Sequence, residues 1–169
     1  LMNRGKGLAM AQLVNVIAPI MAEEHGPAWR QTTFYPFAEA ALHARGQAYA
    51  PAISSPTIYT EAYGDVPAID AVVTWDEQAR TGLLLAVNRA ANTPHTLTID
   101  LSGLPGLPGL GTLALGKAQL LHEDDPYRTN TAEAPEAVTP QPLGIAMNAT
   151  GTCTVTLPAI SWISVEFHG

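Results

Sequence analysis

The chain has 169 residues, enough for one ordinary domain or for a small domain with an extra segment. Hydrophobic residues make up 47% of it and charged residues only 14%, which predicts a folded chain with a core and excludes a disordered one. The formal net charge is −7, and Lys6 and Lys117 are its only lysines. Because no basic stripe is available to neutralise phosphates, we expect no nucleic-acid partner.

Residues 8–20 form an apolar run in which only Gln12 and Asn15 are strongly polar. This pattern predicts a helix that is packed on nearly all sides, ending at or near Pro19. The run follows two cations, as in a secretory signal, but polar residues interrupt it and no small-x-small cleavage site follows. The run is also too short to span a membrane. We therefore expect a cytoplasmic protein with no membrane partner.

A second helix is predicted from near Pro36 to residue 45. Proline is tolerated in the first turn of a helix, and the apolar side chains that follow recur at helical spacing. Arg45 and Gly46 supply a cationic last turn and a glycine stop. The segment 23–32 between the two predicted helices is punctuated by glycine and proline, and we expect a loop with a short strand there.

After about residue 47 the apolar pattern changes to a period of two, which is typical of strands. Short strands separated by glycine, proline and asparagine turns predict an antiparallel β-sandwich. The single cysteine, Cys153, lies in one of them; it permits no internal disulfide, and we expect a buried structural thiol. The predicted strands are 68–75, 81–88, 95–101, 113–121, 144–147, 153–157 and 161–167, with a loop over 104–111.

The chain is therefore divided in two, with residues 1–46 helical and residues 47–169 a sandwich. A helix that is apolar on nearly all sides needs more protein around it than this chain supplies. We expect the first part to belong to a larger unit that continues upstream.

Few residues in the sequence could carry out chemistry. Two acidic clusters, at 23–25 and 123–125, contain groups that bind metals, but adjacent loop residues point in different directions, so we expect solvated loops and no metal. No nucleophile elbow and no phosphate-binding loop is present. We assign no catalytic residue to this chain.

Trp29, Arg30 and Gln31 form one polar and aromatic group with two interpretations. In the first, Trp29 packs and Arg30 pairs with a nearby acid. In the second, the group recognises a sugar, because an indole face accepts the apolar face of a ring and an amide both donates to and accepts from hydroxyls.

The order of the residues closely resembles the family 51 glycoside hydrolases, the α-L-arabinofuranosidases. The longest and most specific matches are residues 11–21 (AQLVNVIAPIM) and 26–32 (GPAWRQT), followed by 34–37 (FYPF). Weaker matches continue in order along nearly the whole chain, at 44–46, 54–56, 65–67, 87–89, 157–158 and 161–162.

This resemblance implies a mainly β fold, with a C-terminal jelly-roll-like sandwich preceded by the last helices and strand of a (β/α)8 barrel. The predicted helix from Leu8 would belong to the outer ring of the barrel after its seventh strand, residues 21–32 would hold the eighth strand and its loop, and residues 33–45 the eighth helix. Active sites of such barrels lie at the C-terminal ends of the strands.

The implied reaction is a retaining hydrolysis that releases terminal non-reducing α-L-arabinofuranosyl residues from arabinan, arabinoxylan or their oligosaccharides, with two catalytic glutamates and no cofactor. In the family both glutamates precede the segment that matches residues 11–21, so neither lies in this chain. Gln31 matches the glutamine that binds the sugar, and Trp29 is a second, weaker candidate. The family also suggests a hexamer. Residues 21–27 (MAEEHGP) depart from the usual Met-Thr-Glu-x-Gly-Gly-Pro, which leaves the linkage preference open.

A second hypothesis is a free-standing carbohydrate-binding or structural sandwich without catalysis. The absence of the glutamates favours it, and the barrel-like first 46 residues argue against it. A related endoglucanase on the same scaffold is a third possibility.

Overall fold

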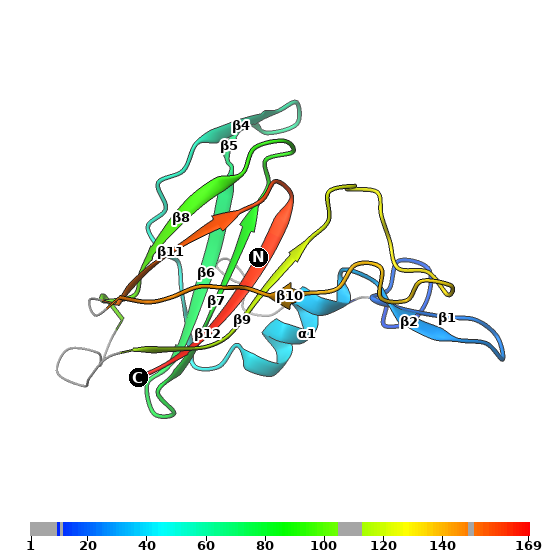
Figure 1. Ribbon diagram of the computed structural model, residues 1–169, viewed down its shortest axis with the longest axis horizontal. Helices are drawn as coiled ribbons and strands as arrows, with labels where there is room; N and C mark the ends of the chain where they lie inside the picture. The colour runs from blue at the N-terminus through cyan, green and yellow to red at the C-terminus, as the bar shows by residue number, and fades with distance from the viewer. Residues whose placement is uncertain (1–9, 11, 105–112, 149–150) are drawn as a thin grey trace.

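A computed structural model describes residues 10, 12–104, 113–148 and 151–169 of the chain. Most of them form an antiparallel β-sandwich, and a β-hairpin and a helix lie beside it (Figure 1). The larger layer is a six-stranded sheet in the order β10-β9-β12-β7-β6-β3, in which every pair of neighbours is antiparallel. Its strands are β3 (Gln47–Tyr49), β6 (Ile69–Asp76), β7 (Thr81–Asn88), β9 (Ala114–His122), β10 (Gln141–Pro142) and β12 (Ser161–His168).

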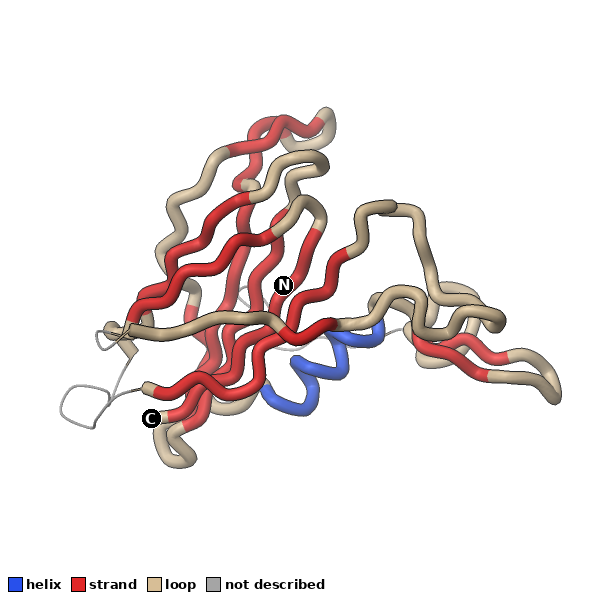
Figure 2. The backbone as a smooth tube through the Cα atoms, viewed as in Figure 1, coloured by secondary structure: helices blue, strands red, loops and turns tan. Residues whose placement is uncertain are grey.

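The second layer is the antiparallel pair β8 (His95–Asp100) and β11 (Thr152–Leu157). Two hairpins extend from the body of the sandwich in different directions, as the backbone tube shows (Figure 2). One is formed by β4 (Thr57–Thr60) and β5 (Gly64–Pro67), and the other by β1 (Ile20–Ala22) and β2 (Ala28–Arg30). The helix α1 (Phe34–His43) follows β2 and leads into β3.

The main core fills the space between the two layers. Side chains of one parity on β12 and β7, among them Ile163, Phe167 and Leu84, pack with Ile99 and Leu157 from the second layer. Because successive side chains of a strand point to opposite faces, the alternating apolar pattern of the sequence is what builds this core. Each fully buried side chain of this kind stabilises the fold by about 1.5–3 kcal/mol.

The opposite face of the large sheet is covered by α1. Leu83, Leu85 and Trp162 are buried on this side, and Ala40 and Ala44 of the helix pack against them. Small alanine side chains allow the helix to lie close to the sheet. The large sheet is therefore packed on both faces, by the second layer on one side and by α1 on the other.

The sequence predicted most of these elements. The strands expected at 68–75, 81–88, 95–101, 113–121, 153–157 and 161–167 are confirmed within one or two residues, and so are the antiparallel sandwich and the second helix. The strand expected at 144–147 is wrong, because only an isolated bridge from Met147 to Cys153 forms there. Of the loop expected at 104–111, residues 105–111 lie outside the described residues.

The helix expected over residues 8–20 is wrong in its described part, because residues 12–19 form turns and one bridge. Asn15 and Val16 have φ values of 64° and 60°, in the left-handed region. The Asn15 backbone N–H donates to the Ile20 carbonyl at 2.8 Å, and its side-chain oxygen accepts from the Ala22 N–H at 2.7 Å. These local bonds offer the backbone an alternative to the helix. Residues 1–9 and 11 lie outside the described residues.

In the described part of the chain, no helix is both long enough and apolar enough to cross a membrane.

Asn88 connects the two layers at one end of the sandwich. Its side chain is 2% exposed, and its Nδ2 donates to the carbonyls of Thr93 (2.9 Å), Leu157 (3.2 Å) and Pro158 (2.8 Å). Its Oδ1 accepts from the Ala90 N–H at 3.0 Å. One amide thus satisfies the backbone groups of the β7–β8 and β11–β12 connections together.

We expect Asn88→Ala to lower the free energy of unfolding by about 1–3 kcal/mol, because buried carbonyls lose their donor. Thermal or urea unfolding measures the change. The matched control is Asn92→Ala in the same loop, where the side chain is exposed and the expected change is within about 0.5 kcal/mol. Equal stability of the two variants would contradict the role assigned to Asn88.

Candidate functional site

The candidate site residues Trp29 and Gln31 lie at the end of the β1–β2 hairpin. In this hairpin Met21 pairs with Trp29 and Ile20 pairs with Arg30. The short strand expected within residues 23–32 is therefore confirmed as β2. Gln31 follows the strand directly; its backbone N–H donates to the Pro19 carbonyl at 2.8 Å, and its carbonyl accepts from the Phe34 N–H at 2.9 Å. Hydrogen bonds of the backbone N–H and of the carbonyl thus fix the position of Gln31, independently of its side chain.

The side chains of Trp29 and Gln31 meet at one acceptor. Trp29 Nε1 donates to the Asn130 carbonyl at 3.0 Å, and Gln31 Nε2 donates to the same oxygen at 3.1 Å. A carbonyl oxygen has two lone pairs and only accepts, so the amide nitrogen of Gln31 must be the atom that faces it. The Gln31 side-chain oxygen, which has no hydrogen-bond partner in the described part of the chain, is therefore available as an acceptor.

Asn130 holds the hairpin to a segment that lies about a hundred residues further along the chain. Its side chain is 1% exposed, and its Nδ2 donates to the Arg30 carbonyl at 2.8 Å and to the Val138 carbonyl at 3.0 Å. Its Oδ1 accepts from the Val138 N–H at 2.7 Å. The residue therefore binds the hairpin through both its backbone and its side chain. Sequence reasoning did not identify it, since it lies in an irregular loop without any periodic signal.

The first of the two interpretations expected Arg30 to pair with a nearby acid. No such pair is present among the described residues. The Arg30 guanidinium instead lies over the Phe34 ring, 5.0 Å from the centroid. Next to it, burial raises the pKa of Tyr35 above its ordinary value. The positive charge of Arg30 partly opposes that rise, Glu136 adds to it, and a hydrogen bond with Asn130 opposes it.

The two acidic clusters lie at the surface. His25 Nε2 is 3.8 Å from Glu24 Oε1, with both side chains more than nine-tenths exposed, and His122 Nε2 is 3.3 Å from a fully exposed Asp124. Cys153 is buried in β11, and burial raises the pKa of its thiol, as expected for a structural cysteine. Among the described residues, side chains suited to hold a metal converge instead at Glu39, His43 and Glu166, on α1 and β12.

The loop before β1 presents an apolar surface to solvent. Leu13 is 60% exposed, Val16 78% and Ile17 81%. Large apolar side chains exposed together in one short segment are a feature of interaction surfaces. This loop adjoins the hairpin that carries Trp29 and Gln31, so the candidate site lies at the edge of the molecule, beside a surface that another protein segment could cover.

The site offers an indole, an oriented amide and an apolar surface on an antiparallel sandwich. Such a set can bind a polyhydroxylated ligand, but it contains no pair of carboxylates arranged for hydrolysis within the described residues. These features define an antiparallel sandwich domain that carries a polar and aromatic hairpin at its edge.

The chain belongs to the family of α-L-arabinofuranosidase C-terminal domains, whose sequence model matches residues 5–161. It is 93% identical over 167 residues to an intracellular exo-α-(1→5)-L-arabinofuranosidase of Bifidobacterium longum, matching 99% of this chain and 30% of that protein. An exo-α-(1→6)-L-arabinofuranosidase of the same organism is 42% identical over 97% of this chain and 31% of its own length. The chain thus spans about a third of the curated relatives it matches.

Solved structures agree. A family 51 α-L-arabinofuranosidase from B. longum superimposes with a TM-score of 0.87 at 93% identity, over 94% of this chain and 29% of that one. An α-L-arabinofuranosidase from Thermotoga maritima, solved with arabinose, gives a TM-score of 0.74 at 20% identity over 92% of this chain and 32% of that one, which shows a shared fold. The resemblance to glycoside hydrolase family 51 is confirmed.

We expect Asn130→Ala to loosen the β1–β2 hairpin, because the Asn130 side chain donates to the Arg30 carbonyl and is itself held by two hydrogen bonds with Val138. Hydrogen exchange followed by mass spectrometry should show faster exchange in residues 20–31 and lower overall stability by about 1–3 kcal/mol. The matched control is Thr131→Ala, which removes only a local bond to the Ala134 N–H. Unchanged hydrogen exchange in the hairpin of the Asn130 variant would show that the Asn130 side chain does not hold the hairpin in place.

Proposed function

We propose that the chain is the C-terminal part of a retaining α-L-arabinofuranosidase that releases terminal non-reducing α-L-arabinofuranosyl residues from arabinan, arabinoxylan or their oligosaccharides. The observation that carries this proposal is the 93% identity to the B. longum exo-α-(1→5)-L-arabinofuranosidase over 99% of the chain. The same identity favours (1→5)-linked arabinofuranosides as the substrate. The relatives named intracellular support a place in the cytoplasm.

In this proposal the reaction uses two glutamates of the upstream barrel. One attacks the anomeric carbon to form a glycosyl-enzyme, while the other protonates the leaving oxygen and then activates water. This chain contributes binding rather than covalent chemistry. The Gln31 side-chain oxygen accepts a hydrogen bond from a sugar hydroxyl, while the bond from its Nε2 to the Asn130 carbonyl fixes the orientation of the amide. Trp29 offers an indole face to the ring, its Nε1 being held by the same carbonyl.

We place the domain boundary between residues 46 and 47. Residues 1–46 then complete a (β/α)8 barrel, with β1 as the eighth strand and α1 as the eighth helix, and residues 47–169 form the sandwich. In support, Gly46 has a φ of +74°, and the large sheet begins with β3 directly after it. The exposed Leu13, Val16 and Ile17 would be covered by the rest of the barrel. The assembly that the family suggests is a hexamer.

The alternative is a carbohydrate-binding or structural sandwich that acts without a barrel. Gel filtration of the natural protein, together with intact mass under denaturing conditions, separates the two. A polypeptide about three times the length of this chain, or a companion chain of the missing size, supports the glycosidase. A stable monomer of 17.8 kDa supports the free module. Activity on β-glucans without release of arabinose would favour a related endoglucanase.

We expect Gln31→Ala in the intact enzyme to lower kcat/KM for a (1→5)-linked arabino-oligosaccharide by about 1–3 kcal/mol of transition-state binding, because a hydroxyl loses its acceptor. Steady-state kinetics give the value. Unchanged kinetics would remove Gln31 from the site.

Two controls distinguish sugar binding from a loosened hairpin. Asn130→Ala weakens the support of the hairpin but keeps the Gln31 amide, so its loss of kcat/KM should be smaller. Gln78→Ala, on the exposed β6–β7 turn, should leave kcat/KM unchanged. An equal loss in the Asn130 and Gln31 variants would assign Gln31 a structural role only.

The apolar surface before β1 gives a separate expectation for the barrel contact. When this chain is produced together with the upstream part of the enzyme, Ile17→Asp should abolish co-purification, because a carboxylate would be buried without a partner. Tyr63→Asp is the control, since Tyr63 is equally exposed but follows β4, in a hairpin far from β1 and β2 (Figure 1). Co-purification of the Ile17 variant would place the barrel contact elsewhere.

A further inference from the structure

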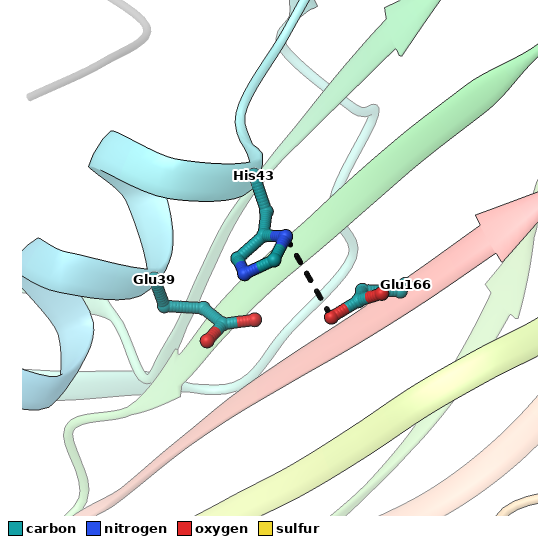
Figure 3. A group of neighbouring side chains, drawn as sticks. All are labelled: Glu39, His43 and Glu166. Atoms are coloured by element: carbon teal, nitrogen blue, oxygen red, sulfur yellow. Dashed lines mark ion pairs between the residues drawn. The ribbon is translucent and has the colours of Figure 1, made fainter. Parts of the chain in front are cut away.

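Three side chains that the proposed reaction does not use converge between α1 and β12. Glu39 and His43 come from the helix, and Glu166 comes from the strand beneath it (Figure 3). Residues four apart on a helix lie on one face, so Glu39 and His43 both face the sheet. One ligand atom from each of the three residues lies within 4.8 Å of the other two. His43 Nδ1 and Glu166 Oε1 are 3.9 Å apart, too far for a hydrogen bond.

The strand places Glu166 on the helix side by alternation. Val165 and Phe167 on either side of it are in the main core, so Glu166 points to the opposite face. The neighbouring strand leaves room for it at Gly116, where a Cβ atom would lie only 3.2 Å from Glu166 Cβ. The pairing of β12 with β9 also shifts register between Val165 and Phe167. The position of Glu166 is therefore set by the sheet rather than by a flexible loop.

Glu39 is the unusual member of the group. The residue is only 8% exposed, and its buried Oε1 has no hydrogen-bond partner in the described residues. Lys117 lines the same groove as Glu39, but no ion pair joins them within the described residues. A buried carboxylate without a partner is costly, and a second carboxylate nearby adds repulsion. Figure 3 shows the Glu39 carboxylate directed toward His43 and Glu166. A cation among the three would satisfy all of them.

We propose that Glu39, His43 and Glu166 bind a divalent transition-metal ion, with Zn²⁺ as the best fit. Imidazole nitrogen and carboxylate oxygen are both zinc ligands, with metal–ligand distances of about 2.0–2.2 Å. Ligand atoms around such an ion lie about 3–3.6 Å apart, so the most widely separated of the three atoms, which lie up to 4.8 Å apart, would need to approach by about 1–2 Å. Calcium fits less well, because it requires six to eight oxygen ligands.

The site would fasten α1 to the centre of the large sheet. His43 and Glu166 are partly exposed, at 42% and 30% of their side chains, which gives the ion a route of entry and a position for water. Under the domain boundary proposed above, the ion would join the last barrel helix to the sandwich. Its role is structural, and it takes no part in the glycosidase reaction.

The test uses the full-length enzyme after EDTA treatment and dialysis. Adding Zn²⁺ should raise its Tm by about 2–5 °C, and Co²⁺ should produce visible absorption bands that Zn²⁺ then displaces. His43→Gln and Glu166→Gln should each lose most of the Tm shift and the bands. Because Zn²⁺ could also bind elsewhere in the enzyme, His122→Gln is the control, as it removes another partly buried histidine with an acidic neighbour and should keep the full response.

Glu39→Gln provides a second, opposite signature. A neutral amide is cheaper to bury than a carboxylate, so this variant should have a higher Tm than the natural enzyme in EDTA, yet should gain little from Zn²⁺. A higher Tm than the natural enzyme in EDTA, combined with a smaller gain from Zn²⁺, is not expected of a residue that only packs against its neighbours. It also keeps the proposal testable if a His43 variant does not fold.

Three results would overturn the proposal. One is a natural enzyme whose Tm is the same in EDTA and in excess Zn²⁺. Another is a Zn²⁺ response that survives in the Glu39, His43 and Glu166 variants. The third is a metal-independent rise in Tm on acidification that disappears in His43→Gln, which would assign the cluster to a protonated imidazole between two carboxylates. None of these results bears on the glycosidase proposal, which is tested by kinetics.

Discussion

The fold depends on β12, a central strand that is buried on both faces and paired on both edges. Along Ser161–His168 it bonds to β7 on one side and β9 on the other, and its residues from Ser161 to Val165 are all buried. Its odd-numbered residues fill the space between the two sheets, while Trp162, Ser164 and Glu166 face α1. A slip of one residue would exchange these two sets, which fixes the register strongly. The helix, the main core and the Glu39–His43–Glu166 group all take their positions from this one strand.

The β1–β2 hairpin is held in place by hydrogen bonds rather than by an apolar core. Trp29, Arg30 and Gln31 all bond to Asn130, which is almost fully buried. A few polar contacts can orient a side chain within a few tenths of an ångström, which apolar packing at an exposed edge does less well. The sandwich therefore does more than cover the helix: through one loop it sets the orientation of the residues proposed to bind the sugar.

Whether an element could be predicted from the sequence depends on how clear an apolar pattern its residues form. The long strands β6, β7, β11 and β12 were predicted because their apolar residues alternate or run continuously between clear turns, and α1 was predicted from helical spacing and the Arg45–Gly46 stop. The strands β3, β4, β5 and β10 were not, since each has only two to four residues and no full period. Residues 12–19 were assigned to a helix because an apolar run with only two polar residues, Gln12 and Asn15, does not specify its own periodicity.

The candidate site was predicted only in part. Trp29 and Gln31 were selected because aromatic and amide side chains suit sugar recognition and because they match a family motif. Their common acceptor could not be predicted, since no pattern in residues 123–140 connects Asn130 to a hairpin so far away in sequence. The Glu39–His43–Glu166 group was missed for the same reason: two members are four apart on a helix, but the third comes from the last strand.

The sequence separation between the β1–β2 hairpin and Asn130 also sets an order of events during synthesis. Trp29 and Gln31 precede Asn130 by 101 and 99 residues. At ribosomal rates of about 5–20 residues per second, the hairpin emerges roughly 5–20 s before its acceptor exists. Until then the Trp29 indole and the Gln31 amide lack the Asn130 carbonyl as an acceptor. The edge that carries Trp29 and Gln31 can therefore become rigid only after Asn130 has been synthesised.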